Sequence, residues 1–345
     1  MTGRARQGGG AKRAVLKAIA SYLPEHQLTN EDLAREYPDW EPQKIFSKTG
    51  IRVRHIAAPG ECASDLGVAA AERLFETASC RRGDIDFLLF CTQSPDYFLP
   101  ATACTMQSRL GLSQNCGALD FNQGCSGFVY GLSLARGLID SDAAGNVLLV
   151  TAETYSKYLD SNDRSTRTIF GDGASAAVIT AVDDAEELIG PFVFGTDGRG
   201  AGELIVRTGA MRNPASTDTE AKIGTAPTHR TLYMNGPEVF NFTIRELPAT
   251  IDRLLQKARL RLEEINYFVF HQANEFMLEH LRKKLSIPRQ KFCINLESYG
   301  NTVSSTIPMA LEIAMCRNQV KTGDRVMIVG FGVGFSWAAA MIKLI

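Results

Sequence analysis

The sequence predicts an α/β fold that contains two copies of one unit. Short apolar runs typical of buried strands alternate with amphipathic stretches typical of helices, which indicates strands joined by helices in a mainly parallel sheet. Residues 261–272 resemble residues 82–92 at a shift of about 180 positions. A repeat of this length indicates a duplicated domain, because the repeats of a solenoid are far shorter.

The first half, residues 14–185, shows the alternation most clearly. We expect strands at 14–20, 51–56, 84–91, 117–121, 146–151 and 175–182. We expect helices that start by N-cap chemistry at 29–32, and others over 66–78, 102–110 and 127–139. Residues 1–13 are basic and rich in glycine without the apolar core of a signal peptide, so we expect a disordered tail there.

The second half, residues 186–345, starts the same order again. A polar stretch at 210–229 predicts a loop, and 239–260 predicts a long helix that is interrupted at Pro248. A strand follows within 261–272, and the strand expected at 324–330 corresponds to 146–151. Glycines divide the uncharged run 326–342, so it predicts two buried strands joined by a turn and no membrane span.

The composition excludes several classes of protein. With 45% hydrophobic residues the chain is not disordered. The net charge of −1, with both signs interspersed, indicates neither a nucleic-acid-binding protein nor a polybasic membrane anchor. The eight cysteines show no CxxC and no zinc spacing, so we expect no metal site and reduced thiols in a cytoplasm.

Cys125 lies where the pattern changes from strand to helix. Gly124 and Gly127 permit a sharp turn on either side of it, and an amphipathic run continues to Ile139. Unpaired N–H groups and the dipole at a helix N-terminus favour a thiolate, which is how proteins activate a cysteine. The alternative is an inert packing group, because free cysteines are often simply buried.

The repeat indicates partners for Cys125. When the two copies are aligned, Cys91 corresponds to His271 and Cys125 to Asn301. If the copies pack about a pseudo-twofold axis, Cys125, His271 and Asn301 meet in one cleft. Taken singly, a histidine at a strand end is usually structural, and a Gly-Asn pair is a common turn.

Taken together, these residues suit thioester chemistry. Cys125 would attack an acyl thioester and hold the acyl group, while backbone amides of Cys125 and of the glycine turn 330–335 stabilise the oxyanion. His271 and Asn301 are neutral donors when desolvated. Aimed at one carbonyl oxygen, they would stabilise the enolate that forms when a malonyl thioester loses carbon dioxide.

From about residue 14 to the end, the sequence resembles the ketoacyl-acyl-carrier-protein synthase III family of the thiolase superfamily. The motifs that show it are GCSGF at 124–128, Arg164 with FGDGA at 170–174, HQAN at 271–274, GNT at 300–302 and GVGFSW at 332–337. The resemblance implies a thiolase-like duplicated fold with five αβαβα layers, a homodimer, a Cys125–His271–Asn301 triad, and no metal or bound cofactor.

The resemblance also implies roles for other residues. The oxyanion amides fall on Cys125 and Val333, and Phe170 falls in the substrate site. Arg164 matches a residue that contacts CoA, and Leu99 matches an aromatic residue that a partner subunit lends to the acyl pocket. The basic helix that docks acyl carrier protein (ACP) falls on Arg282, Lys283 and Lys284. The substrates implied are an acyl-CoA or acyl-ACP primer and malonyl-ACP.

The sequence departs from the family at some contact positions. A tryptophan that stacks on CoA is replaced by Lys44, a CoA-contacting asparagine by Pro237, and a carrier-protein arginine by Phe276. These departures favour a primer delivered on carrier protein, or one bulkier than acetyl. An enzyme that passes the acyl group to an alcohol or amine without decarboxylation remains an alternative, as does a non-catalytic subunit, and the pathway is left open.

Overall fold

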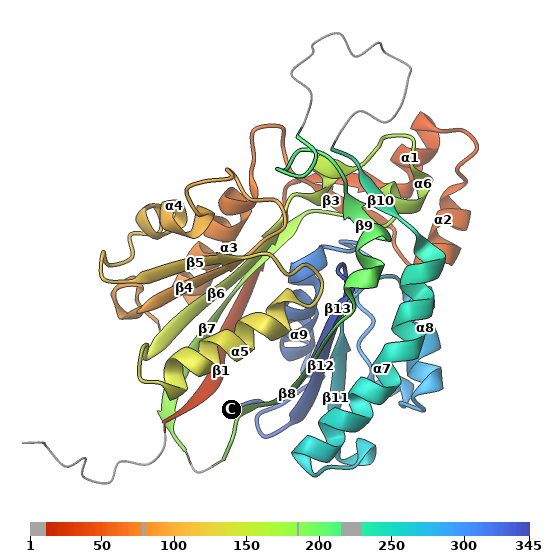
Figure 1. Ribbon diagram of the computed structural model, residues 1–345. Coiled ribbons are helices and arrows are strands. Elements are labelled where there is room, and N and C mark those ends of the chain that lie inside the picture. Colours follow the sequence, from red (N-terminus) through yellow and green to blue (C-terminus); the bar gives the residue numbers. More distant parts are fainter. Residues whose placement is uncertain (1–11, 78–79, 185, 215–229) are drawn as a thin grey trace, which may run out of the picture.

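The computed structural model describes residues 12–77, 80–184, 186–214 and 230–345, and two large sheets dominate it (Figure 1). The tail predicted at 1–13 lies outside the described residues up to residue 11. Lys12 and Arg13 already belong to the first strand, because their backbones pair with Asp183 and Val182. Of the loop predicted at 210–229, residues 215–229 lie outside the described part.

The first sheet has the strand order β1-β7-β6-β4-β5. Its strands are β1 (Lys12–Tyr22), β4 (Phe87–Cys91), β5 (Gly117–Phe121), β6 (Asn146–Glu153) and β7 (Gly173–Asp183). Strand β4 runs parallel to both β5 and β6, whereas β7 is antiparallel to β6 and to β1. The chain then crosses to the second sheet between β7 and β8.

The second sheet has the order β11-β12-β13-β8 and repeats the directions of the first. Its strands are β8 (Ile189–Thr196), β11 (Tyr267–Phe270), β12 (Arg325–Gly332) and β13 (Ser336–Lys343). The pair β11–β12 is parallel, like β4–β6, and the next two pairs are antiparallel. The duplication is therefore confirmed, but the prediction of a mainly parallel sheet is wrong. The three residues between β12 and β13 are too few for a crossover, so these strands must form a hairpin.

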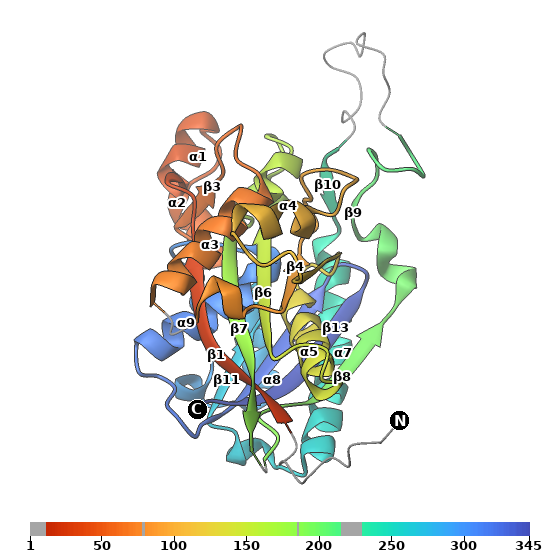
Figure 2. The ribbon, with the colours of Figure 1, turned by 90° about the vertical axis from the view of Figure 1, so that its left-hand side faces the viewer.

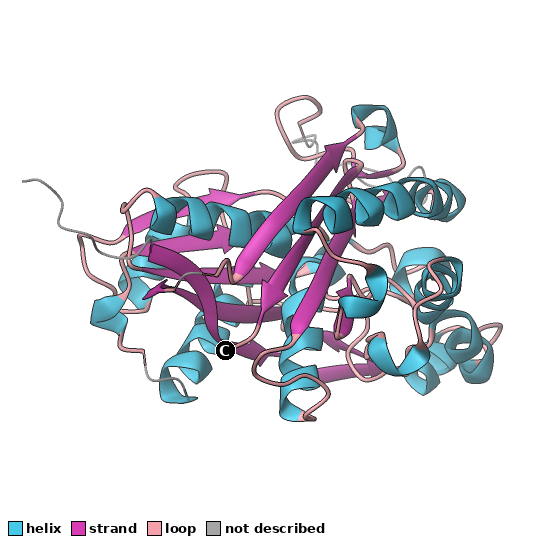
Figure 3. Cartoon of the chain, turned by 90° about the horizontal axis from the view of Figure 1, so that it is seen from below, coloured by secondary structure: helices cyan, strands magenta, loops and turns pink. Residues whose placement is uncertain are grey.

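Helices lie between the sheets and on both outer faces (Figures 2 and 3). The central helices α5 (Gly127–Asp140) and α9 (Thr306–Cys316) share one apolar core with the inner faces of both sheets. Helices α3 (Ala63–Thr77) and α4 (Thr102–Arg109) cover the first sheet, and α7 (Gly236–Ala258) and α8 (Glu275–Lys284) cover the second. The strands β4, β6, β11 and β12 are almost wholly buried, because helices cover both faces of their sheets, and their sequences are mostly apolar. The five αβαβα layers predicted are confirmed.

Smaller elements gather at one end of the sheets, at the top of Figure 1. They are β2 (His26–Thr29), β3 (Val53–Ile56), β9 (Leu204–Val206), β10 (Leu232–Met234), α1 (Asn30–Glu36), α2 (Pro42–Thr49) and α6 (Arg164–Arg167). Short 3-10 helices occur at Arg82–Asp84, Tyr155–Tyr158, Gly198–Gly202, Leu262–Glu264, Arg289–Lys291 and Val303–Ser305. Helix α1 starts as its sequence predicts, because Thr29 and Asp32 form a capping box.

Helix α7 corrects one prediction, because it continues through Pro248 without a break. A proline inside a helix removes one hydrogen bond and costs about 3 kcal/mol. The helix buries Leu247, Ile251 and Leu254 against the second sheet. Burial of one such side chain contributes about 1.5–3 kcal/mol, so this apolar face outweighs the lost bond. Among the described helices, none combines the length and the apolar character that a membrane crossing requires.

Candidate active site

Cys125 lies in the tight turn between β5 and α5, as its flanking glycines predict. A side chain at Gly124 would collide with the amide of Gln93, and one at Gly127 would collide with the sulfur of Cys91. The turn therefore packs directly against the end of β4, and Cys125 is only 5% exposed. It precedes the first turn of α5, which begins at Gly127.

Strand β12 of the second half reaches the same turn. A Cβ atom at Gly330 would lie 2.6 Å from the Cα of Ser126, and one at Gly332 would lie 2.8 Å from the Cys125 sulfur. These two positions accept no side chain, because real Cβ contacts are longer. The glycines thus bring the backbone of the second half against Cys125, with the amide of Val333 within hydrogen-bonding reach of the sulfur.

Burial governs the protonation state of Cys125. Burial, followed by the charge of Glu153, raises the pKa of its thiol to about 12. Hydrogen bonds from the amides of Val333 and of Cys125 itself lower that pKa but do not compensate. The predicted resting thiolate is therefore wrong, because desolvation outweighs the helix N-terminus. The thiol needs a base that accepts its proton.

His271 directly follows β11, in the place that Cys91 occupies at the end of β4. Its ring is 2% exposed, and burial lowers its pKa to about 3, so the imidazole is neutral. Nδ1 lies 2.7 Å from the hydroxyl of Thr306, and that hydroxyl donates to the carbonyl of Val303 at 3.0 Å. The hydroxyl therefore accepts from Nδ1–H, and Nε2 is the unprotonated nitrogen.

Asn301 joins His271 from the turn before α9. Its Oδ1 accepts a hydrogen bond from the amide of Val303 at 2.9 Å, which leaves Nδ2 to lie 3.5 Å from Nε2 of His271. Its backbone pairs with Phe170, and Gly300 before it has a left-handed φ of 72° that favours glycine. Both the place and the direction of the amide are thus fixed.

One cavity of about 120 Å³ contains all three triad residues predicted from the sequence. Its walls also include Phe170, which is 3% exposed, so the predicted substrate-site position is part of the cavity. Most of the remaining lining is apolar, namely Ile169, Leu204, Met234, Val239, Ala273, Met277 and Phe331. The arrangement is suited to an acyl chain that ends in a reactive carbonyl.

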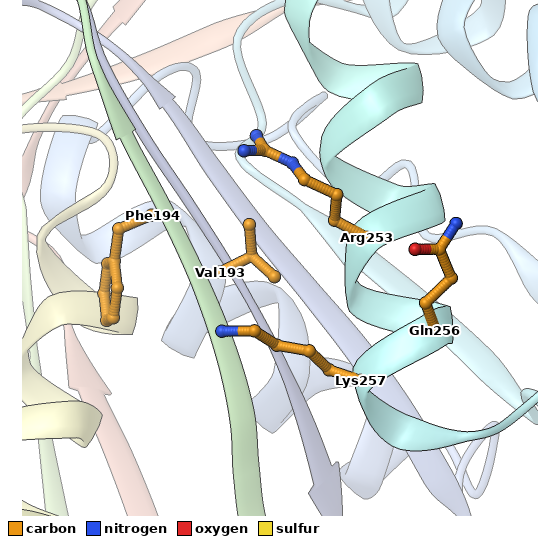
Figure 4. Close-up of a pocket in the computed structure, with 5 residues that line it drawn as sticks. All are labelled: Val193, Phe194, Arg253, Gln256 and Lys257. Carbon is orange, nitrogen blue, oxygen red and sulfur yellow. The ribbon is translucent and has the colours of Figure 1, made fainter.

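A wider groove of about 420 Å³ lies between α7 and β8 (Figure 4). It is lined by Val193, Phe194, Arg253, Gln256 and Lys257, of which only Lys257 has a side chain that can act as a nucleophile. The ammonium of Lys257 already donates to the carbonyl of Phe192 at 3.1 Å. The smaller cavity is therefore the candidate active site, because it contains Cys125, His271 and Asn301.

Other predicted residues lie outside the cavity. Leu99 is 81% exposed in the segment after β4, and Arg164 lies at the start of α6 with its guanidinium 4.8 Å from the ring of Trp40. Lys283 and Lys284 are exposed on α8. Arg282 is not free to dock a partner, because its side chain is 16% exposed and pairs with Glu279 at 2.8 Å.

Several site residues escaped the sequence analysis. Thr306 fixes the imidazole, Trp40 lies under Arg164, and Glu153 is buried beside the nucleophile. Of these three residues, only Trp40 could have been found from the sequence. It lies four positions before Lys44, which replaces the tryptophan that the family uses to stack on CoA. In the described part of the chain, His, Cys, Asp and Glu side chains form no group of three that could hold a metal ion.

Comparison with known proteins agrees with this geometry. Residues 119–198 match the model of 3-oxoacyl-[acyl-carrier-protein (ACP)] synthase III, and residues 255–344 match the model of its C-terminal part. The chain is 38% identical over 330 residues to the beta-ketoacyl-[acyl-carrier-protein] synthase III of Caldanaerobacter subterraneus subsp. tengcongensis, covering 96% of this chain and 97% of the relative. The chain belongs to the 3-oxoacyl-[acyl-carrier-protein] synthase III family.

Solved structures of this family superpose closely. A 3-oxoacyl-(acyl-carrier-protein) synthase III has a TM-score of 0.92 at 52% identity, covering 96% of this chain and all (100%) of the other. The priming beta-ketosynthase of the R1128 polyketide pathway has a TM-score of 0.86 at 29% identity, covering 98% of each chain. The predicted thiolase-like fold and acyltransferase class are confirmed: the chain is a synthase III-type condensing enzyme.

Proposed function

We propose that this chain transfers an acyl group from a thioester to Cys125 and then condenses it with malonyl-ACP, releasing carbon dioxide. The observation that supports this most is the shared cavity, in which the sulfur of Cys125 meets the side-chain nitrogens of His271 and Asn301. Acyl-CoA or acyl-ACP would supply the primer. The steps need no metal or bound cofactor, because the thioesters and these side chains supply every reacting group.

The acylation step begins with a neutral thiol. Nε2 of His271 accepts the proton of Cys125 as the sulfur attacks the thioester carbonyl, and the amides of Cys125 and Val333 stabilise the oxyanion. The thiolate that leaves from the thioester then takes the proton from His271 and departs as a thiol. The imidazole is thereby restored, and the acyl group is bound to Cys125.

The condensation step uses His271 and Asn301 as donors. Loss of carbon dioxide from malonyl-ACP leaves an enolate, whose oxygen accepts hydrogen bonds from Nδ2 of Asn301 and from Nε2–H of His271. The second bond requires the other imidazole tautomer, which the Thr306 hydroxyl permits because it can donate as well as accept. The enolate carbon attacks the acyl carbonyl, and the Cys125 sulfur leaves as a thiolate that takes up one proton from water.

A second copy of the chain would complete the acyl site. Strand β5 ends the first sheet with an unpaired edge, and Leu119 on it is 45% exposed. Tyr97, Phe98 and Leu99, in the segment between β4 and α4, are exposed at 62%, 75% and 81%. Pairing of β5 with its equivalent would cover this apolar surface and bring Leu99 toward the partner's cavity. A cytoplasmic location stays a prediction.

The test is intact-protein mass spectrometry. The enzyme is incubated with acyl-CoA and acyl-ACP thioesters of several chain lengths, and malonyl-ACP is then added to the labelled protein. We expect an adduct on Cys125 that disappears with release of carbon dioxide, and no adduct on Cys125→Ala. An adduct that malonyl-ACP leaves unchanged would overturn condensation and indicate acyl transfer to an alcohol or amine.

A further inference from the structure

Glu153 is a buried carboxylate whose hydrogen-bond donors are neutral. It is the last residue of β6 and is 0% exposed. One carboxylate oxygen accepts from the amide of Gln93 at 2.9 Å and from the hydroxyl of Ser94 at 3.2 Å, and the other accepts from the hydroxyl of Ser304 at 2.8 Å. These three hydrogen bonds stabilise the negative charge only in part, because the burial of a carboxylate beside neutral donors costs free energy.

These donors belong to the two loops that frame the active site. Gln93 and Ser94 begin the segment that leads to Leu99, and Gln93 also accepts from Tyr155 at 2.6 Å and packs against Gly124 beside the nucleophile. Ser304 lies three positions after Asn301. Glu153 therefore ties a loop of the first half to the Asn301 turn of the second.

The titratable neighbours of Glu153 are themselves acids. They are Cys91 at the end of β4, Cys125 in the catalytic turn, Tyr155 and Tyr158 after β6, and Asp172 before β7. Every anion in the proposed reaction, at the sulfur or at an oxygen, would form in the field of this carboxylate. The negative charge of Glu153 destabilises those anions, because repulsion between like charges is strong where water is excluded.

We propose that Glu153 is a positioning residue of this site, which aligns the Gln93 and Asn301 loops and, when ionised, suppresses the thiolate of Cys125. The inference rests on the proposed role of Cys125 as nucleophile. Burial raises the pKa of Glu153 to about 7, so the carboxyl changes its charge in the neutral range. His271, with a pKa of about 3, stays neutral from pH 6.5 to 9. Burial raises the pKa of Asp172 to about 6, so that carboxyl is mostly ionised above pH 7, where the variants are compared.

Alkylation of Cys125 by iodoacetamide tests this, because only the thiolate reacts. The rate is measured from pH 6.5 to 9 by mass spectrometry of the Cys125 peptide. In the unchanged enzyme the logarithm of the rate should rise with pH and flatten above about pH 7, because ionisation of Glu153 then cancels the gain in thiolate. In Glu153→Gln it should keep rising, so that the variant reacts about tenfold faster at pH 8 and equally fast at pH 6.5.

The matched control is Glu312→Gln. Glu312 is a largely buried carboxyl on α9 that bonds to Ser21, and burial raises its pKa too. In this variant the logarithm of the alkylation rate should level off above about pH 7, as it does in the unchanged enzyme. A Glu153→Gln alkylation rate that still levels off above about pH 7 would overturn the proposal. So would a rate that increases by the same factor at every pH, because that result indicates only that iodoacetamide reaches Cys125 more easily.

A second variant keeps the test valid if Glu153→Gln does not fold. Ser304→Ala removes one hydrogen bond to the carboxylate and should move the onset of flattening to higher pH. An unchanged onset would contradict the proposal. Alkylation needs neither primer nor malonyl-ACP, so its outcome is independent of whether the condensation reaction is correct.

Discussion

The Nδ2 atom of Asn301 lies 3.5 Å from the Nε2 atom of His271, although the two residues come from different loops of the second half. The remaining polar atoms of both side chains are already bonded, to the amide of Val303 and to the hydroxyl of Thr306. These two nitrogens therefore meet in the wall of the cavity, where Nδ2 also lies 3.5 Å from the carbonyl oxygen of Ala273. Cys125 comes from the first half, so the site requires both copies of the repeat.

Replacement of Asn301 by alanine should separate the two chemical steps. Acylation of Cys125 needs the base His271 and the backbone amides, and these remain in place. Enolate formation loses one of two donors, so decarboxylation of malonyl-ACP should slow by about a hundredfold to a thousandfold. The measurement is the acyl adduct by mass together with release of labelled carbon dioxide. Equal loss of both steps would contradict the assignment of Asn301 to the enolate.

Thr306→Val should impair acylation through the imidazole. The variant keeps the shape of Thr306 but removes the acceptor for Nδ1–H of His271. Without it the ring is free to turn or to change tautomer, and we expect the acylation rate to fall by about tenfold or more. Thr243→Val is the matched control, because that buried hydroxyl bonds only its own helix, to the carbonyl of Val239. Acylation of Thr306→Val at the normal rate would disprove this role.

Gly332→Ala should displace the nucleophile. The added Cβ would lie 2.8 Å from the Cys125 sulfur, so either the sulfur or β12 must move. A displacement of about 1 Å near a reacting atom can cost about a hundredfold in rate, and we expect a loss of that size in acylation. Gly60→Ala controls for the substitution itself, because its Cβ would meet nothing within 4 Å. Far-ultraviolet circular dichroism would show that both variants are folded.

The residues proposed as catalytic were predictable because local signals mark them. Cys125 and Asn301 each follow a glycine that a sharp turn requires, and His271 ends an apolar strand. The internal repeat then indicates that the three meet. Their state was less predictable, since the resting thiolate expected from the turn is reversed by burial, which depends on chain segments distant in sequence.

The parts that escaped prediction depend on long-range packing. A period of two marks a strand without giving the direction of its neighbour, so the antiparallel placing of β7 and β13 was missed. Glu153 resembles an ordinary residue at a strand end, and its role emerges only when Ser304 packs against it. The sequence places Arg282 in a basic run with Lys283 and Lys284, but the helical spacing brings Glu279 beside it and the two side chains pair.

Charge reversal at Lys283 and Lys284 should weaken the use of carrier protein. Both side chains are exposed on α8, and the N-cap residue of that helix, Asn274, lines the cavity. Carrier proteins that present acidic residues would be attracted to this surface, so the double variant Lys283→Glu, Lys284→Glu should lower kcat/KM for malonyl-ACP by about tenfold or more. Acylation of Cys125 by a small thioester that carries no protein should be unchanged, because it does not need this contact.

Ionic strength and a distant control make this last prediction specific. Salt screens exposed charges, so the unchanged enzyme should lose carrier-protein activity at high salt and approach the variant. Lys321→Glu, a reversal at an exposed lysine before the start of β12, should behave like the unchanged enzyme. Arg282→Glu is unsuitable as a test of docking, because it would place two carboxylates together where Arg282 now pairs with Glu279. Equal losses with malonyl-ACP and with the small thioester in the double variant would show that these lysines stabilise the fold and do not bind the carrier protein.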